Sequence, residues 1–228
     1  IAILTNCFVP CNGRFPTLIL LSGFFFAGGN PVAAGGFVFL LIVLAVSITL
    51  LASFLLSKTI LRGVPSAFVL ELPPYRRPKL GEVIVRSMLD RPIFVLARAV
   101  TVAIPAGAVI WLCQNIMVNG HTLLYGMATV LEPLGACMGL SGVILMAFLL
   151  GIPANEIVIP ILLMVYSQSG TLVEAEGIAQ AGAILAANGW TWVTAVCVIL
   201  FSLNHFPCAT TLLTIRKETG SLLWTGVS

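Results

Sequence analysis

The stretch GFVFLLIVLAVSITLLASFLLS, residues 36–57, contains 22 residues and no charged side chain. A helix of about 20 apolar residues spans the hydrocarbon core of a bilayer. Because no water is available there, each backbone amide must find its hydrogen-bond partner within the protein, and a helix provides these partners within one segment. The stretch therefore predicts a transmembrane helix.

The rest of the chain has a similar composition. Of its 228 residues, 59% are hydrophobic and 8% are charged, whereas soluble domains are about 25% charged. Further uncharged runs cover 99–118, 133–155 and 177–215. These runs do not alternate apolar and polar residues as the strands of a membrane barrel do. We predict an all-α polytopic membrane protein, and we expect it to be a fragment because the first residue is not Met and both ends lie in apolar sequence.

Positive charge gathers in one part of the chain. Eight of the eleven Lys and Arg residues fall between Lys58 and Arg98, so the positive-inside rule predicts that this segment is cytoplasmic. Nucleic-acid binding is the weaker interpretation, because the segment lies between two apolar runs and contains several prolines. We expect 71–79 (ELPPYRRPK) to be extended and the residues that follow to form an interfacial helix leading into a span over 93–117. The loop 118–133 is then external.

The apolar sequence after residue 133 does not fit one simple span. As a single helix, 134–167 would be about 51 Å long, well beyond a core of about 30 Å. Two half-length helices meeting at 151–153 fit better. Small residues such as Gly135, Gly139 and Gly142 predict close helix packing in the first of them.

Three stretches place polar groups and prolines at membrane depth: FVPCNGRFP (8–16), GIPANEIVIP (151–160) and NHFPCATT (204–211). A proline removes a helical hydrogen bond, and irregular backbone in a bilayer is tolerated where it lines a cavity or is buried in protein. Transporters hold their ions at such discontinuous helices. The three stretches together predict broken helices around an ion site.

Several side chains in these stretches are candidate ligands of a transition-metal ion. Cys11 and Cys208 each follow a proline, and Glu156 is an ionisable group among Ile and Val residues. His205 is a further candidate. The alternatives remain open, because Glu156 can instead cap a helix and a cysteine in a membrane helix can serve packing alone. The positive charge of Arg14 argues against a bare cation site beside it, and we expect it to pair with an acid or to mark the cytoplasmic mouth.

No enzyme signature accompanies these candidates. The sequence contains no HExxH, GxSxG or P-loop pattern, and its two His residues lie far apart. We therefore predict a protein that is not an enzyme and that holds no cofactor of its own.

Four blocks, FVPCNGRFPTLI, LRGVPSAFVLELPPYRRP, GIPANEIVIPI and HFPCATTLLTIRKETGSLLWT, resemble the transmembrane part of the FeoB family of prokaryotic ferrous-iron transporters. The resemblance implies two inverted Gate-type halves built from broken helices. Residues 1–57 would end the first half, 58–92 would form a cytoplasmic connection, and 93–228 would form the second half, incomplete at its C-terminus. It also implies that Cys11 and Cys208 are candidate metal contacts and that Asn155 joins Glu156 in a signature of the second half.

The same resemblance implies a setting for the chain. Members of this family transport Fe²⁺ across the inner membrane, and an N-terminal cytoplasmic GTPase domain binds the GTP. A small FeoA-type protein, a second copy of the chain and the lipid bilayer are further expected partners, whereas nucleic acid is not. The alternative function is a membrane assembly module that conducts no ion, in which the Gly-rich 134–142 and the basic 58–98 dock other domains or subunits.

Overall fold

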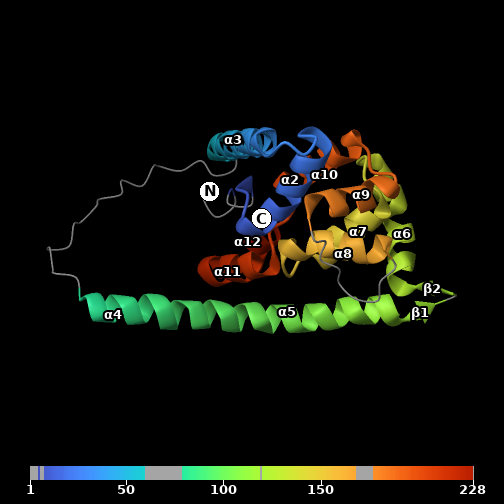
Figure 1. The fold of residues 1–228 in the computed structure, drawn as a ribbon. Coiled ribbons are helices and arrows are strands. Elements are labelled where there is room, and N and C mark those ends of the chain that lie inside the picture. The colour runs from blue at the N-terminus through green and yellow to red at the C-terminus, as the bar shows by residue number, and fades with distance from the viewer. Residues whose placement is uncertain (1–4, 6–7, 60–78, 119, 168–176, 228) are drawn as a thin grey trace.

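The computed structural model describes residues 5, 8–59, 79–118, 120–167 and 177–227. This part of the chain consists of helices and one short β-hairpin (Figure 1), so the prediction of an all-α membrane protein is confirmed. The expected extended stretch 71–79 lies outside the described residues except for its last residue.

The N-terminal part contains one broken helix and one long helix. A 3₁₀ turn, η2 (Asn12–Arg14), leads into α2 (Phe15–Leu21), which continues as the π-helical turn η3 (Ser22–Phe26). Asn30 is the N-cap residue of the long helix α3 (Pro31–Lys58), and its side chain accepts a hydrogen bond from the Val32 amide at 3.0 Å. Helix α3 is long and apolar enough to span a membrane, as the sequence predicts for residues 36–57.

A second long rod runs along the other side of the molecule (Figure 1). It consists of α4 (Leu80–Val85), the π turn η4 (Arg86–Asp90) and α5 (Arg91–Asn115), which follow one another without a gap. Pro105 lies inside α5 and does not end it.

The segment expected to be a loop over 118–133 is mostly helical, so that expectation is wrong. Strands β1 (Met117–Val118) and β2 (His121–Thr122) pair in antiparallel fashion, and α6 (Leu123–Cys137) follows at once. The Thr122 hydroxyl accepts a hydrogen bond from the Tyr125 amide and so caps α6. The loop was inferred from the predicted topology alone, and the structure shows that this helix instead buries part of its apolar face in the core.

Helices α6 and α7 (Gly142–Leu150) form a hairpin with a bend of 110°. A methyl group on Gly142 would lie 2.0 Å from the Ala128 carbonyl oxygen, so the two backbones approach as closely as only glycine permits. The Glu132 carboxylate accepts a hydrogen bond from the Gly142 amide at 2.6 Å, at the N-terminus of α7. The predicted close packing of the small residues is confirmed.

The C-terminal part is a series of short helices. The 3₁₀ turn η5 (Asn155–Ile157) and α8 (Val158–Tyr166) follow the end of α7, so the predicted break at 151–153 is confirmed. The first of the two predicted half-length helices is not a single helix, because the chain bends between Cys137 and Gly142. Four more helices complete the described chain: α9 (Ile178–Ala187), α10 (Trp192–Asn204), α11 (Ala209–Thr219) and α12 (Leu222–Val227). The region Trp192–Thr219 is also long and apolar enough to span a membrane, although it contains the break between α10 and α11, and α6 with α7 could make a third, bent span.

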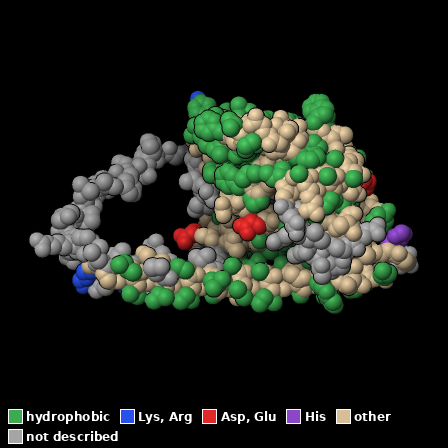
Figure 2. Space-filling model, in the orientation of Figure 1, with side chains coloured by type: hydrophobic (Ala, Val, Ile, Leu, Met, Phe, Trp, Pro, Cys, Tyr) green, Lys and Arg blue, Asp and Glu red, His purple; other side chains and the backbone are tan. Residues whose placement is uncertain are grey.

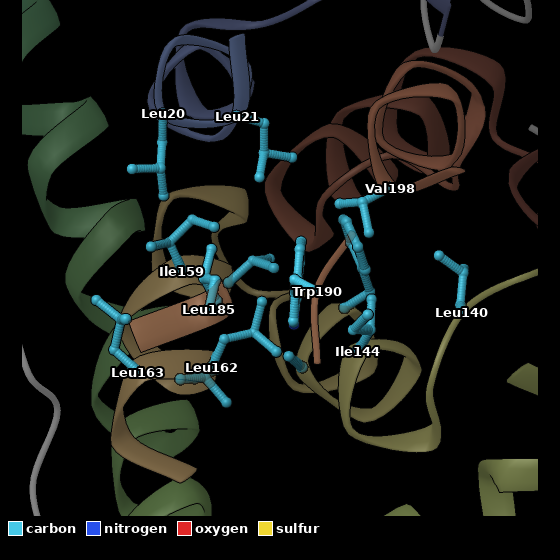
Figure 3. Packing of buried hydrophobic residues seen from close by; sticks show 14 of the residues in the cluster. Leu20, Leu21, Leu140, Ile144, Ile159, Leu162, Leu163, Leu185, Trp190 and Val198 are labelled. Carbon is cyan, nitrogen blue, oxygen red and sulfur yellow. The ribbon is translucent and has the colours of Figure 1, made fainter. Parts of the chain in front are cut away.

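The core lies where α2, α7, α8, α9 and α10 meet (Figure 3). Trp190 lies there between Leu162, Leu185 and Ile144, and its indole donates a hydrogen bond to the Tyr166 hydroxyl at 3.0 Å. Hydrophobic side chains also cover much of the visible surface, including the α4–α5 rod (Figure 2). A surface of this kind suits lipid rather than water.

Candidate functional site

The three proline-containing breaks come together in space. The Ala209 amide, at the start of α11, donates a hydrogen bond to the Ile152 carbonyl at 2.8 Å and so joins the second break to the third. Turn η2 packs beside η5, where a methyl group on Gly13 would lie 3.1 Å from Cγ of Glu156. Segments that are about 140 and 190 residues apart in the sequence thus form one centre. Backbone groups that the breaks release thus find partners in distant segments of the protein.

A cavity of about 150 Å³ lies at this centre. Its walls come from all three breaks, and the lining residues are Val9, Pro10, Cys11, Arg14, Asn155, Pro207, Cys208 and Thr211. The volume is sufficient for an ion with a few water molecules. The structure therefore brings three of the five predicted ligand residues, Cys11, Cys208 and Asn155, to one cavity.

The two cysteines occupy equivalent backbone positions. Cys11 is the N-cap residue of η2 and Cys208 is the N-cap residue of α11, and both have extended backbone dihedral angles. Neither thiol caps its helix, so both sulfur atoms remain available to the cavity. Their neighbours differ: Cys208 Sγ lies 3.1 Å from the Thr210 hydroxyl and 3.2 Å from that of Thr211, whereas Cys11 Sγ lies 3.8 Å from Nδ2 of Asn155.

Asn155 connects the cavity to a buried histidine. Nε2 of His205 lies 3.3 Å from Oδ1 of Asn155, and Nδ1 of His205 lies 2.9 Å from the Ser202 carbonyl oxygen. A carbonyl can only accept, so Nδ1 carries the proton and Nε2 of the neutral ring is an acceptor. If the Asn155 amide turns over, it can donate to Nε2 and accept from the Cys11 thiol. With a neutral His205 ring, this flipped orientation is the one that satisfies both contacts, and it presents the Asn155 oxygen to the Cys11 thiol and the cavity.

His205 is buried, with 5% of its surface exposed, and does not line the cavity. It contacts the cavity residue Asn155. Its ring packs among Phe148, Phe201 and Phe206, with centroid distances between 5.1 and 5.8 Å. This placement suits a residue that orients the Asn155 side chain without itself reaching the cavity.

Glu156 lies at the edge of the centre, in the first turn of η5, where it is exposed to the surroundings of the molecule. It is not among the residues that line the cavity. A carboxylate in the first turn of a helix interacts favourably with the helix dipole, as the alternative role of Glu156 at a helix N-terminus requires. Its role as a ligand stays a prediction.

Arg14 is the functional candidate whose partners could not be predicted. The guanidinium is buried and donates to two backbone carbonyls, those of Leu203 and His205, at 3.2 and 3.1 Å. The signal in the sequence was an arginine within an apolar segment, but nothing in the sequence pointed to carbonyl groups about 190 residues away.

Within the described residues, no three His, Cys, Asp or Glu side chains are close enough together to hold a metal ion. The centre thus offers two thiols, an amide and backbone groups around a small space, which is a sparse set of ligands. Thiols favour softer divalent cations, whereas the amide oxygen suits harder ones.

Two family models match the chain. The Gate family, described as nucleoside recognition, matches residues 96–222, and a family described as ferrous iron transport protein B C terminus matches residues 38–91. The first match includes the breaks at Asn155 and Cys208, whereas Cys11 lies before both matches. No solved structure matches the chain.

Curated relatives match nearly the whole chain. A protein of Staphylococcus aureus (strain COL) named Fe(2+) transporter FeoB is 29% identical over 239 aligned positions, covering 99% of this chain and 33% of the relative. A protein of the same name from Methanocaldococcus jannaschii is 27% identical, with 96% and 33% coverage. A Porphyromonas gingivalis protein named Fe(2+) transport protein A/Fe(2+) transporter FeoB fusion protein is 25% identical, with 98% and 31% coverage. The chain thus spans about a third of the length of these relatives.

Proposed function

The chain belongs to the Gate family, in the form found in the C-terminal membrane part of FeoB proteins, and on this premise we propose that it is the permeation part of a ferrous-iron transporter. In this proposal Fe²⁺ crosses the membrane through the centre where the three breaks meet. Cys11, Cys208 and Asn155 contact the ion inside the cavity, His205 orients Asn155, and Glu156 attracts the ion at the edge.

One observation supports this proposal above the others: three breaks from distant parts of the sequence converge on a cavity that contains two thiols and an amide. Fe²⁺ is a borderline ion that accepts both sulfur and oxygen ligands. Because conduction requires binding that is weak enough for the ion to leave, a sparse ligand set suits passage better than storage.

The test is iron uptake by the natural full-length protein that contains this chain, reconstituted in liposomes. We expect Cys208→Ser and Cys11→Ser each to reduce the initial rate of Fe²⁺ uptake at least about tenfold, because losing one charged contact costs about 1.5–3 kcal/mol. Glu156→Gln is expected to have a smaller effect, since Glu156 lies outside the cavity. The matched control is Cys137→Ser, which replaces an exposed cysteine at the end of α6.

The control variant should transport iron at the wild-type rate, and all variants should reach the membrane in equal amounts. Normal uptake in both Cys11→Ser and Cys208→Ser would sink the assignment of ligands. A loss of uptake in Cys137→Ser equal to that in Cys11→Ser would show that cysteine replacement in general, rather than the cavity, is responsible.

The wider setting is part of the same proposal. We place the chain in a prokaryotic inner membrane, with residues 58–92 on the cytoplasmic side and with transport coupled to a GTPase domain elsewhere in the protein. The Porphyromonas gingivalis fusion supports a functional link to a FeoA-type partner. Assembly of several copies is a further expectation.

No observation favours the alternative of a pure assembly module. Its main support was the Gly-rich segment 134–142, and its glycines are used for packing inside the chain. A methyl group on Gly135 would lie 2.7 Å from the Leu140 carbonyl oxygen, and one on Gly139 would lie 2.9 Å from Sγ of Cys197.

A further inference from the structure

Arg14 is a buried cation in the wall of the cavity. It ends η2, is 3% exposed, and its two terminal nitrogens donate to the carbonyls of Leu203 and His205. Burying a guanidinium is costly unless its N–H groups are hydrogen-bonded. The two carbonyl contacts therefore hold the charge in place.

Both carbonyls belong to the break between α10 and α11. In an unbroken helix, the carbonyl of residue 203 accepts from the amide of residue 207, and that of residue 205 accepts from the amide of residue 209. Residue 207 is proline and has no N–H. The Ala209 amide donates elsewhere, to the Ile152 carbonyl at 2.8 Å. Arg14 thus donates to the two carbonyls whose helical donors the break removes.

The end of a helix with released carbonyls carries partial negative charge and attracts cations. Transporters with broken helices use such carbonyls to coordinate a free coupling cation. In this chain a guanidinium already occupies that position. We propose that Arg14 is a tethered substitute for a bound cation: its guanidinium occupies the carbonyl site at the broken end of α10, so this site takes no free alkali cation. The role of the site in transport rests on the proposed function, whereas the substitution itself does not.

The proposal assigns separate roles to the groups that line one cavity. The guanidinium fills the carbonyl site, and Cys11, Cys208 and Asn155 remain as candidate contacts for a second cation. The positive charge of Arg14 repels a second cation from the carbonyls. The transported ion therefore contacts the thiols and the amide rather than these carbonyls.

The first test measures cation binding without iron. The natural full-length protein is purified as wild type, Arg14→Ala and the control Arg216→Ala, which removes an exposed arginine from α11. Melting temperatures are followed during titration with low millimolar guanidinium, Na⁺ or K⁺, with choline at equal ionic strength. We expect guanidinium or an alkali cation to raise the melting temperature of Arg14→Ala by about 3 °C or more and to leave wild type and Arg216→Ala unchanged.

The second test measures Fe²⁺ uptake in liposomes. Each variant is compared with wild type in the same salt, so that any effect of the cation on the coupled GTPase domain cancels. Arg14→Ala should transport at least about tenfold more slowly in choline and recover in part with guanidinium, because the unpaired carbonyls regain a cation. If wild type moves no Fe²⁺, the proposed function fails, while a cation-dependent melting temperature of Arg14→Ala still supports the role of Arg14.

Two results would overturn the inference: an Arg14→Ala protein whose melting temperature responds to none of the cations, or an uptake defect that no cation relieves. If Arg14→Ala does not accumulate in the membrane, Arg14→Lys takes its place, because the ammonium keeps the charge but loses the two-pronged geometry. Arg14→Lys should accumulate and transport in choline faster than Arg14→Gln, and equal rates for these two variants would count against the proposal.

Discussion

The chain interrupts its apolar helices in two different ways, and the α6–α7 hairpin and the centre of the three breaks show the contrast. In the hairpin, glycines let the backbones of the two helices lie in direct contact, and the Glu132 carboxylate accepts a hydrogen bond from the Gly142 amide at the start of α7. At the centre, prolines remove donors, the Arg14 side chain and the Ala209 amide replace them, and a cavity of about 150 Å³ remains. Both regions are interrupted helices, yet at the centre of the three breaks Cys11, Cys208 and Asn155 line a cavity.

The difference teaches that a broken helix does not by itself make a site. A break becomes a candidate site when its released backbone groups are satisfied by distant partners, because such partners hold the chain ends apart and leave room between them. Where glycines let the backbones touch, no room remains. Four substitutions test this comparison.

The largest expected effect is at the hairpin. We expect Gly142→Val to prevent the accumulation of folded protein, because even a methyl group would lie 2.0 Å from the Ala128 carbonyl oxygen and 2.7 Å from the Glu132 amide. Membrane abundance and the fraction of monodisperse protein after extraction measure the effect. A folded Gly142→Val protein would mean that the hairpin is not packed as described.

The next effect concerns the centre. Pro207→Ala restores an amide that can donate to the Leu203 carbonyl in competition with Arg14. We expect α10 and α11 to become more continuous, and Fe²⁺ uptake to fall about tenfold through the loss of about 1.4 kcal/mol of positioning. The control is Pro133→Ala, since Pro133 lies inside α6 without breaking it. Equal uptake by the two variants would remove the special role of the proline at the centre.

A smaller effect is expected from the hydrogen bond between the Glu132 carboxylate and the Gly142 amide at the N-terminus of α7. Glu132→Gln keeps an acceptor for the Gly142 amide but removes the charge, so we expect the free energy of unfolding to fall by about 1 kcal/mol. Denaturant unfolding of the purified protein measures it. Iron uptake should not change, because Glu132 does not line the cavity. Reduced uptake at unchanged stability would link the hairpin to transport and weaken the comparison.

The smallest effect is a gain. Gly126 lies inside α6 with open space around its Cα, so Gly126→Ala should raise the free energy of unfolding by about 0.5–1 kcal/mol. Compared with Gly142→Val, it separates glycines that are needed for packing from those that are not. A destabilised Gly126→Ala would indicate that a neighbour absent from the single chain packs against this face.

Much of the fold could be predicted from the sequence because lipid restricts the possible structures. The long apolar runs allowed only helices, and prolines at 10, 153 and 207 marked the places where these helices break. The helix α6 was missed because 118–133 was assigned as the external loop that follows a predicted span, and packing against the core shows why part of it is helical.

The candidate site could be predicted only in part. Cys11 and Cys208 were candidates by residue type and Asn155 through the family resemblance, and the structure places all three around one cavity. Glu156 has the right chemistry but lies at the edge, and no local feature of the sequence distinguishes an inward from an outward side chain in a short 3₁₀ turn. Whether these residues bind iron is a question for the uptake measurements.

The sequence by itself determined that this is a helical membrane protein with three polar breaks, since composition and proline positions act locally. The tertiary structure alone decided that the breaks meet. It also decided that the Ala209 amide donates to the Ile152 carbonyl and that the Arg14 guanidinium donates to the carbonyls of Leu203 and His205. The physical reason is that a broken helix releases backbone groups whose partners must be found within the protein. Which distant segment supplies those partners depends on how the helices pack, and no local pattern in the sequence encodes it.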